Sequence, residues 1–533
     1  MSQKQWWQTG IVYQIYPRSF KDANGDGVGD LRGIIEKLDY LNDGTPNSLG
    51  VDAIWISPFY PSPMKDFGYD VADYCNVNPL FGTLADFDEL VREAHKRNIK
   101  VIIDWVPNHT SDEHPWFKQS RQSKDNPKSD WYLWRDAKAD GSLPNNWGSH
   151  FGGPAWTWDE TRQQYYFHQF DPGQPDLNWR NPQVESAMMN ALRFWLNRGV
   201  DGFRMDVVYM IMKHPDLPDQ PVIADAQARA ENDLYFRQDQ IYSHSYEGIH
   251  PLMRRIRQVI DGYSDKVAIG EIWIEPEKWV RYYGTHDTPE LHMPFNFRLI
   301  NTPWTAEAVR DEVNFMEDLL PAHATPNYVL NNHDQPRLAS RVGVDQTRVA
   351  GMLLLTLRGT PTLYMGEEIG MVNGDIKPEQ VRDPQGIRMG VEVTRDVCRT
   401  PFQWDASENA GFGTGETWLP INADYVTRNV AAQSQDPHSI LSLYRRLIWL
   451  RKDSPALQDG EYYPSEAPQG VFAYTRSAST ETLFIALNFT GERQSVKLPR
   501  TGEVVLNTLL NREGSVSDVL ELAPHEGVVL RLS

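Results

Sequence analysis

The chain has 533 residues, with 52 basic and 72 acidic side chains and a formal net charge of −20. This length allows a large hydrophobic core in two or three domains, and the negative charge disfavours nucleic acid or an anionic membrane as a partner. The composition therefore favours a soluble protein that binds an uncharged small molecule. We expect a monomer or a weak dimer.

Only two cysteines, Cys75 and Cys398, are present, which is too few for a disulfide framework. The first seven residues lack the apolar core of a signal peptide, and no later run approaches the roughly 18 apolar residues of a membrane span. These features predict a protein of a reducing compartment, and we expect it to be cytoplasmic.

Short apolar runs alternate with helical patterns along most of the chain, which is typical of an α/β fold built as a (β/α)8 TIM barrel. The predicted strands are 11–16, 51–58, 100–104, 199–206, 267–271, 291–295, 328–332 and 360–365. The predicted helices include 31–41, 84–97, 182–197, 305–320, 346–357 and 440–450.

Two segments depart from this alternation. Residues 109–179 are rich in Trp, Pro, Gly, Asn and Asp without a helical period, which predicts a subdomain inserted after the third strand. Residues 461–533 read as short strands separated by turn residues, which predicts a C-terminal antiparallel β-sandwich. The barrel would then comprise residues 1–108 and 180–460.

A loop after the first predicted strand carries oxygen donors at every second residue. The donors are Asp22, Asn24, Asp26, the carbonyl of Val28, and Asp30. Gly25 and Gly27 permit tight turns, so the alternation can surround one hard divalent cation. The loop is not an EF-hand, because Gly33 stands where that motif has Glu. An Asx-rich turn without an ion is the alternative.

Three predicted strands end in, or next to, a carboxylate: Asp206, Glu271 and Asp334. A buried, unpaired carboxylate is costly, so we expect these acids to meet at the mouth of the barrel, where the carboxyl ends of its strands converge. Two carboxyl groups roughly 5 Å apart suit retaining glycoside hydrolysis. For Asp206 alone, a structural ion pair with Arg204 is the alternative.

The segments around these acids resemble the strand-end motifs of the α-amylase family, glycoside hydrolase family 13. The matching segments are Gly202-Phe203-Arg204-Met205-Asp206, Gly270-Glu271, Asn332-His333-Asp334 and Asp104-Trp105-Val106-Pro107-Asn108-His109. Gln174-Pro175-Asp176-Leu177-Asn178 is similar to a segment typical of the oligo-1,6-glucosidase branch. The resemblance extends over nearly the whole chain and implies a (β/α)8 barrel.

The resemblance also implies catalytic roles. Asp206 would attack the anomeric carbon, Glu271 would act first as acid and then as base, and Asp334 would hold the sugar hydroxyls. Glu271 should then hold its proton while Asp206 stays ionised, and Arg204 is placed on the same side of its strand to ensure this. His109 is expected to bond hydroxyls of the bound glucose.

Further substrate contacts follow from the same resemblance. His333, like His109, would bond glucose hydroxyls. Asp66 and Tyr69 would clasp the non-reducing glucose, and Phe170 would line its pocket. Arg399 would reach the same hydroxyls as Asp66. The alternatives are a turn cap for Asp66, ordinary core packing for Tyr69 and Phe170, and a surface ion pair for Arg399.

The function implied is a retaining, exo-acting α-glucosidase that releases glucose from short isomalto- or malto-oligosaccharides. Val207 stands at a position where, in this branch, valine accompanies cleavage of α-1,6 bonds and threonine a preference for α-1,4 bonds. A transglucosylase and a sucrose-acting glucosidase or isomerase are the alternatives, and a non-catalytic amylase-like domain is disfavoured because all three acids are present. Related loops bind calcium or magnesium, of which we expect calcium, and no organic cofactor is expected.

Overall fold

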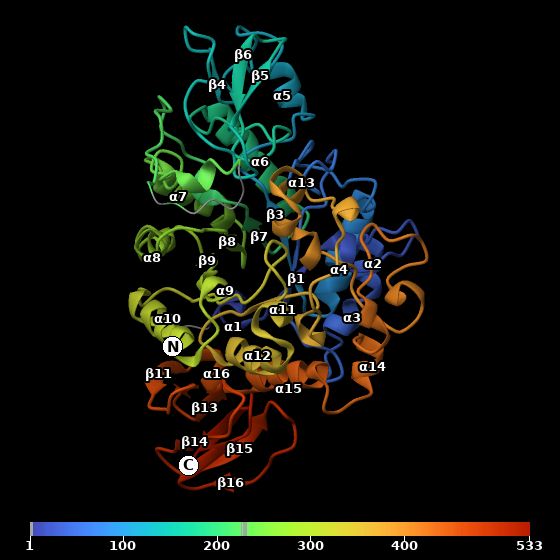
Figure 1. Ribbon diagram of the computed structural model, residues 1–533, viewed down its shortest axis with the longest axis vertical. Helices are drawn as coiled ribbons and strands as arrows, with labels where there is room; N and C mark the ends of the chain where they lie inside the picture. The colour runs from blue at the N-terminus through green and yellow to red at the C-terminus, as the bar shows by residue number, and fades with distance from the viewer. Residues whose placement is uncertain (1–3, 225, 227–231) are drawn as a thin grey trace.

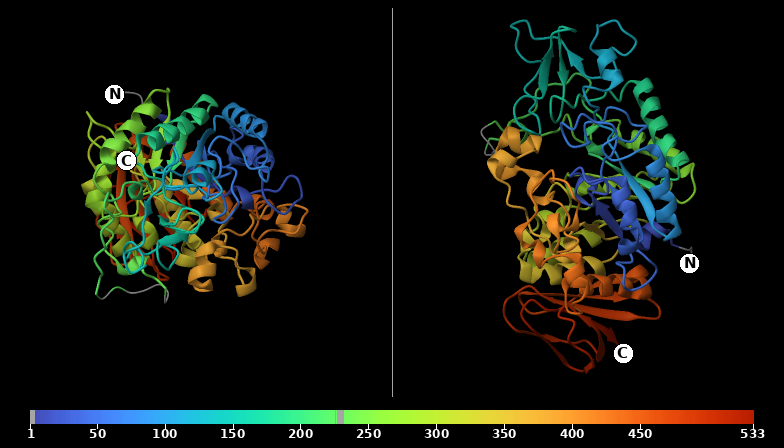
Figure 2. Two further views of the ribbon diagram at one scale, coloured as in Figure 1. Left: turned by 90° about the horizontal axis from the view of Figure 1, so that it is seen from above. Right: turned by 90° about the vertical axis from the view of Figure 1, so that its right-hand side faces the viewer.

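The computed structural model describes residues 4–224, 226 and 232–533. A parallel sheet with surrounding helices forms the middle of the molecule, between a small subdomain above it and a β-domain below it (Figure 1). The right-hand view of Figure 2 shows the same three layers from the side. The predicted fold class is confirmed. In the described part of the chain, no helix is long and apolar enough to cross a membrane.

The central sheet has the strand order β10-β1-β2-β3-β7-β8-β9, and each pair of neighbours is parallel. The strands are β1 (Val12–Ile15), β2 (Ala53–Ile56), β3 (Lys100–Trp105), β7 (Gly202–Met205), β8 (Val267–Gly270), β9 (Met293–Pro294) and β10 (Thr362–Tyr364). Nearly every residue in them is buried. This is why they read as continuous apolar runs without alternation.

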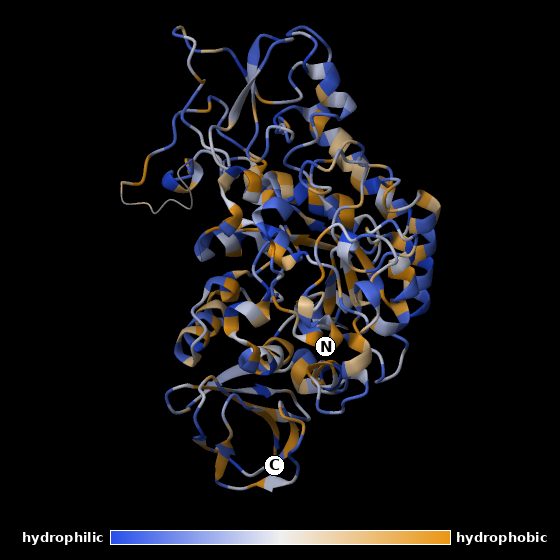
Figure 3. Ribbon diagram, turned by 45° about the vertical axis from the view of Figure 1, so that its right-hand side comes forward, coloured by the Kyte–Doolittle hydropathy of each residue, from blue (hydrophilic) through white to orange (hydrophobic). Residues whose placement is uncertain are grey.

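Successive residues of these strands face two different cores. Ile54 packs outward against the surrounding helices, whereas Trp55 packs inside the barrel with Ile102, Ile269 and Phe295. Figure 3 shows apolar residues concentrated along the central strands. Side chains therefore fill the barrel interior, so a substrate site of the barrel has to lie at one end of its strands.

The expected strand 328–332 is not a regular strand in the structure. Two isolated parallel bridges take its place, from Asn296 to Tyr328 and from Val329 to Thr362, and they link β9 to β10. The backbone N–H of Asn332 bonds to the side chain of Asn331 at 2.9 Å. The segment therefore closes the ring with few ladder bonds.

Helices surround the barrel, as the sequence predicted. The longer ones are α4 (Leu84–Lys96), α6 (Pro182–Asn197), α7 (Ile249–Asp261), α10 (Ala306–Leu319), α12 (Thr347–Thr356) and α15 (Ile440–Asp453). The shorter ones are α1 (Trp6–Thr9), α8 (Pro276–Trp279), α9 (Arg298–Asn301), α11 (Leu338–Val342), α13 (Pro384–Met389), α14 (Val430–Ser434) and α16 (Pro455–Asp459). The expected single helix 31–41 is divided at Lys37 into α2 (Leu31–Glu36) and α3 (Leu38–Leu41).

The segment after β3 forms a small antiparallel sheet and one short helix. These are β4 (Trp134–Arg135), β5 (Trp156–Asp159), β6 (Gln164–Phe167) and α5 (Pro115–Ser120), with strand order β4-β6-β5. The loop between β7 and α7 packs against this subdomain, because Trp147 Nε1 donates to the carbonyl of Pro218 at 2.6 Å and Asn145 Nδ2 donates to that of Leu217 at 2.8 Å. The two segments together overhang the carboxyl ends of the strands (Figure 1).

The C-terminal strands form two antiparallel sheets. The larger contains β11 (Glu461–Ser465), β12 (Val471–Ser477), β13 (Thr482–Asn488), β18 (Gly527–Leu532), β15 (Gly502–Asn507) and β16 (Ser515–Val516), and the smaller contains β14 (Gln494–Lys497) and β17 (Val519–Leu522). Apolar residues of both sheets, among them Phe484 and Val496, form one core. Tyr474 and Arg476 of β12 bond to Thr356 of α12, which ties this domain to the barrel.

Candidate active site

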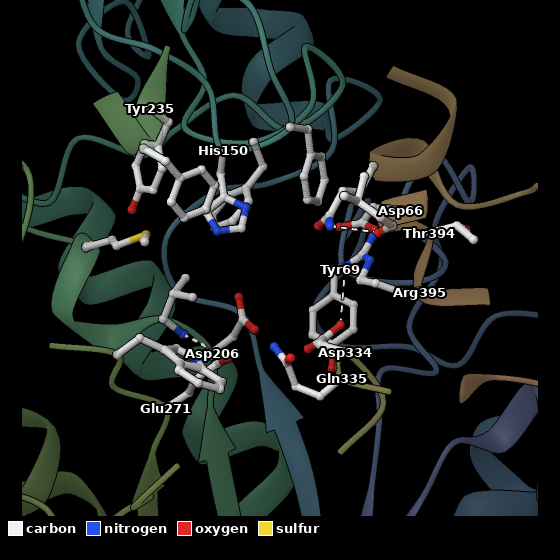
Figure 4. Close-up of a pocket in the computed structure, with 18 of the residues that line it drawn as sticks. Asp66, Tyr69, His150, Asp206, Tyr235, Glu271, Asp334, Gln335, Thr394 and Arg395 are labelled. Atoms are coloured by element: carbon white, nitrogen blue, oxygen red, sulfur yellow. Dashed lines mark hydrogen bonds and ion pairs between the residues drawn. The ribbon is translucent and has the colours of Figure 1, made fainter. Parts of the chain in front are cut away.

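A cavity of about 700 Å³ lies at the carboxyl ends of the barrel strands (Figure 4). In Figure 4, Asp206 and Glu271 lie on one wall, and Asp66, Arg395 and Asp334 lie on the opposite one. The site residues proposed from the sequence that line it are Asp66, Tyr69, His109, Phe170, Asp206, Val207, Glu271 and Asp334. The other three proposed residues, Arg204, His333 and Arg399, are fully buried behind the walls.

Arg204 lies beneath the cavity and contacts three carboxylates. Its Nη1 lies 2.9 Å from Asp206 Oδ1 and 2.5 Å from Asp104 Oδ1, and its Nη2 contacts Glu271 Oε2. The guanidinium is planar and keeps its charge, so it fixes the positions of all three acids. Its single charge is shared among them.

Asp206 and Glu271 are nearly buried, with 7 % and 5 % of their surface exposed. Burial raises the pKa of Asp206, Arg204 opposes this shift, and the neighbouring carboxylates of Glu271 and Asp104 reinforce it. The sequence predicts that Arg204 keeps Asp206 ionised, and in the structure this one cation contacts three acids. The net effect is a pKa of Asp206 above its ordinary value, because burial and the neighbouring carboxylates outweigh the share of Arg204.

The third acid, Asp334, has an environment of the opposite sign. Its Oδ1 lies 2.7 Å from Arg399 Nη2 and 3.3 Å from Arg395 Nη1, and its Oδ2 lies 3.2 Å from His333 Nε2. Burial alone would raise the pKa of Asp334, but His333 and the two arginines lower it below its ordinary range. Asp334 is therefore ionised and held by fixed donors.

His333 does not project into the cavity. Its ring stacks between Tyr16 and Tyr69, with the Tyr69 ring centroid at 5.4 Å. Its Nε2 bonds to the Tyr69 hydroxyl and its Nδ1 to Gln14 Nε2, both at 2.7 Å. Since both ring nitrogens are engaged, His333 supports Tyr69 and Asp334 and has no nitrogen left for a sugar in this conformation.

Asp66 binds an arginine to which the sequence analysis gave no role. Arg395 Nη2 lies 2.7 Å from Asp66 Oδ1 and also binds Asp383, whereas Arg399 is directed to Asp334. Arg395 thus joins the loop after β2 to the long loop after β10. Gln174 Nε2 bonds to the other oxygen of Asp66 at 3.1 Å.

His109 and Phe170 meet on the subdomain side of the cavity, with their rings 5.3 Å apart. His109 Nε2 lies 3.0 Å from Gln174 Nε2 and 3.1 Å from the Tyr69 carbonyl. Burial lowers the pKa of His109 to about 4, so its imidazole is neutral near pH 7. Its Nδ1 lies 3.1 Å from Asn108 Nδ2, so both ring nitrogens have protein partners, and a sugar hydroxyl would have to replace one of them.

The comparisons with known proteins agree with this geometry. The family model of the α-amylase catalytic domain matches residues 14–460. The chain belongs to the α-amylase family. It is 41% identical to a probable α-glucosidase of Rhizobium meliloti (strain 1021), over 93% of this chain and 91% of that protein, and 38% identical to an oligo-1,6-glucosidase of Parageobacillus thermoglucosidasius, over 99% of both. The crystal structure of the α-glucosyl transfer enzyme XgtA matches with a TM-score of 0.93 and 39% identity, over 100% of both chains.

Several lining residues of this α-amylase-family chain were missed by sequence reasoning. They are Arg395, His150, Phe151, Gln174, Tyr209, Tyr235 and Trp273. Arg395 lies four residues before Arg399 in the same long loop, and this proximity could have indicated that Arg395 also belongs to the site. The aromatic residues come from irregular loops, where no period or motif distinguishes them. Gln174 stood in a quoted motif but had no assigned role.

The proposed cation loop lies away from this cavity, beside residues 407–414. Asp22 accepts hydrogen bonds from the backbone of Gly25 and Gly27 at 2.6 and 3.0 Å, and Asp30 accepts them from Ala23 and Gly33 at 3.0 and 2.7 Å. These are bonds that an Asx-rich turn would make without an ion. Among the described residues, no three Asp, Glu, His or Cys side chains are arranged as ligands of a metal.

Proposed function

We propose that the protein is a retaining, exo-acting α-glucosidase that releases glucose from the non-reducing end of short α-glucosides. The observation that carries the exo assignment is the pair of ion contacts from Arg395 to Asp66 and Asp334. They span the cavity wall between two loops, whereas an endo-acting enzyme needs a groove that continues past the bound glucose. The relatives named probable α-glucosidase and oligo-1,6-glucosidase support the assignment as a glucosidase.

In the proposed mechanism, Asp206 attacks the anomeric carbon while Glu271 donates its proton to the departing oxygen. Water then attacks the glucosyl-enzyme, with Glu271 taking up the proton, so the anomeric configuration is retained. Asp334, kept ionised by Arg395 and Arg399, would bind sugar hydroxyls as the ring flattens. This step requires Asp206 to attack as a carboxylate while Glu271 supplies the proton.

Rates of glucose release from maltose, isomaltose, sucrose and soluble starch, measured in parallel, test this proposal. We expect release from at least one of the two glucose disaccharides and little release from starch. The first product seen by NMR should be α-glucose, because the configuration is retained. Rapid shortening of starch chains, or release of β-glucose, would contradict the proposal.

A transglucosylase is the second candidate, and the match to XgtA favours it. The two activities differ only in whether water or a sugar hydroxyl intercepts the glucosyl-enzyme. Product analysis at high disaccharide concentration separates them, because a transglucosylase forms trisaccharides where a hydrolase releases only glucose. A sucrose isomerase would instead convert sucrose into an isomeric disaccharide.

Val207 carries a prediction about linkage. The residue lines the cavity and follows Asp206 with a left-handed backbone, φ +34°. Threonine is nearly isosteric and equally β-branched, so Val207→Thr adds a hydrogen-bonding hydroxyl without changing volume or backbone strain. We expect the ratio of isomaltose to maltose hydrolysis to fall roughly tenfold, since one hydrogen bond is worth about that factor. An unchanged ratio in competition assays would contradict this role.

We also propose one divalent cation, calcium in preference to magnesium, bound by the loop from Asp22 to Asp30. All five donors are oxygens, as such ions require. Burial raises the pKa of Asp30, and within the described ranges neither Asp22, Asp26 nor Asp30 forms an ion pair with Lys or Arg. A bound cation would compensate this negative charge.

Chelation tests the cation directly. We expect EDTA to lower the melting temperature by several degrees while changing the initial rate little, because the loop is remote from the acids and the ion stabilises the native state by mass action. Elemental analysis of the purified protein should find one cation per chain. If elemental analysis finds no metal and added calcium does not change the melting temperature, the loop is an Asx-rich turn without an ion.

We further infer a cytoplasmic protein, monomeric or weakly dimeric. Both cysteines are free thiols, and Cys398 is fully buried. Light scattering of the purified protein and fractionation of the source cells would test these two points.

A further inference from the structure

Trp273 lies two residues after Glu271 and contacts it directly. The indole Nε1–H donates to Glu271 Oε1 at 2.9 Å. The other carboxyl oxygen, Oε2, contacts Arg204 and lies 3.3 Å from the backbone nitrogen of Val207. Both oxygens of the proposed acid are therefore held by donors from different parts of the chain.

The indole is itself fixed in place. It stacks on Phe297 with the ring centroids 4.2 Å apart and the planes 5° from parallel. Phe297 belongs to the core inside the barrel, against which Trp273 also packs. An aromatic pair of this kind has little rotational freedom, so the direction of the Nε1–H is set before a substrate arrives.

Trp273 also lies where the leaving group must depart. It lines the main cavity and a neighbouring one of about 690 Å³, so its ring forms part of the wall between them. Gln240 and His244 complete this shared wall. The oxygen that Glu271 protonates joins the glucose to the rest of the substrate, and this boundary lies beside Glu271.

We propose that Trp273 is a positioning residue, which orients the Glu271 carboxyl for proton transfer and stabilises its ionised form. This inference rests on the proposed function for the acid–base role of Glu271. As the C1–O bond breaks, its electron pair goes to the leaving oxygen, which receives the Glu271 proton, and Asp206 bonds to C1. An indole N–H only donates, so its bond to Glu271 strengthens as the carboxylate forms. An interaction that grows toward the transition state accelerates the step.

The exchange Trp273→Phe removes the N–H and keeps an aromatic ring on Phe297. We expect it to lower kcat for the preferred disaccharide roughly tenfold, the factor that one hydrogen bond to a charged group supplies. With α-glucosyl fluoride, whose leaving group needs little protonation, kcat should fall less than about twofold. The limb of the kcat/KM profile that reports loss of the proton from the acid should move to higher pH, because a carboxylate without this donor binds its proton more tightly.

Trp279→Phe is the matched control. Trp279 is buried on the neighbouring α8, and its Nε1–H donates at 2.8 Å to the backbone carbonyl of Phe295, not to a carboxylate. This variant should keep the wild-type ratio of disaccharide to fluoride hydrolysis and both pH limbs. Phe297→Leu, which frees the indole but keeps its N–H, should lower the disaccharide rate more than the fluoride rate, by a smaller factor than Trp273→Phe.

The result with Trp273→Phe is decisive in either direction. Equal losses on both substrates with an unmoved pH profile, or behaviour like that of Trp279→Phe, would overturn the positioning role. Circular dichroism and the melting temperature report independently of activity whether each variant is folded. Wild-type protein that cleaves neither disaccharide nor fluoride would instead refute the proposed function itself.

Discussion

Replacing Asp206 by Asn should lower kcat for the preferred disaccharide at least about 10⁴-fold, because the amide cannot form the covalent bond to the anomeric carbon. KM should change far less, since the residue acts mainly in the transition state. The native carboxyl is buried beside Glu271 and Asp104, which raise its pKa together with burial. Removing this charge relieves repulsion, so we expect the melting temperature to stay the same or rise. Steady-state kinetics and calorimetry measure both.

Asp201→Asn provides a control at the other end of the same strand. Asp201 is 2 % exposed, and it binds His95 Nε2 at 2.6 Å and the backbone N–H of Val101 at 2.9 Å. Its removal should lower stability with little effect on kcat, which is the reverse of the Asp206 pattern. A variant without the Asp206 carboxylate that remained active would end its assignment as nucleophile.

Azide can replace the missing nucleophile. In Asp206→Ala, azide should attack the anomeric carbon of α-glucosyl fluoride from the vacated side, displace fluoride and give β-glucosyl azide. NMR of the product identifies the configuration. An α-azide, or no rescue at any azide concentration, would argue against a nucleophile on that face.

The sequence predicted the acids for a physical reason. Asp206 and Glu271 each follow a buried parallel strand, and the carboxyl ends of such strands must meet at one face of a barrel. This rule fixes their placement without any knowledge of the loops. The order of the strands follows from the same regular alternation, and within the described residues the segment 328–332 pairs through two isolated bridges instead of a regular ladder.

Contacts between long loops could not be predicted in this way. The bond from Arg395 to Asp66 joins residues that lie 329 positions apart, and two irregular loops set its geometry. For the same reason the sequence analysis gave Arg395 no role and did not predict that Arg399 binds Asp334. His333 was expected to bond glucose hydroxyls, whereas its ring stacks between Tyr16 and Tyr69, an arrangement that no periodic pattern encodes.

The exchange Arg204→Met should be the most destabilising substitution in the site. Arg204 has no exposed surface and holds the carboxylates of Asp104, Asp206 and Glu271. Methionine preserves much of the apolar volume but leaves three buried acids without a cation. Removing one partner of a buried ion pair costs about 3–5 kcal/mol, and we expect a loss of at least this size in urea unfolding at pH 7. Activity should be lost as well, because both proposed catalytic carboxyls lose their common anchor.

The pH dependence distinguishes this electrostatic cause from simple loss of packing. Burial raises the pKa of Asp104 to about 6 even with Arg204 present, and the variant should raise it further. A carboxyl whose folded pKa exceeds its unfolded value of about 4 destabilises the fold only at a pH where it would ionise in the unfolded chain. The loss of unfolding free energy in Arg204→Met should therefore be small at pH 5 and grow through pH 8. Arg451→Met is the control: Arg451 is equally buried, but it donates to the backbone carbonyls of Leu355, Leu357 and Gly359. The loss of unfolding free energy in Arg451→Met should be nearly constant over this pH range. An equally constant loss in Arg204→Met would show that the three carboxylates do not depend on the charge of Arg204.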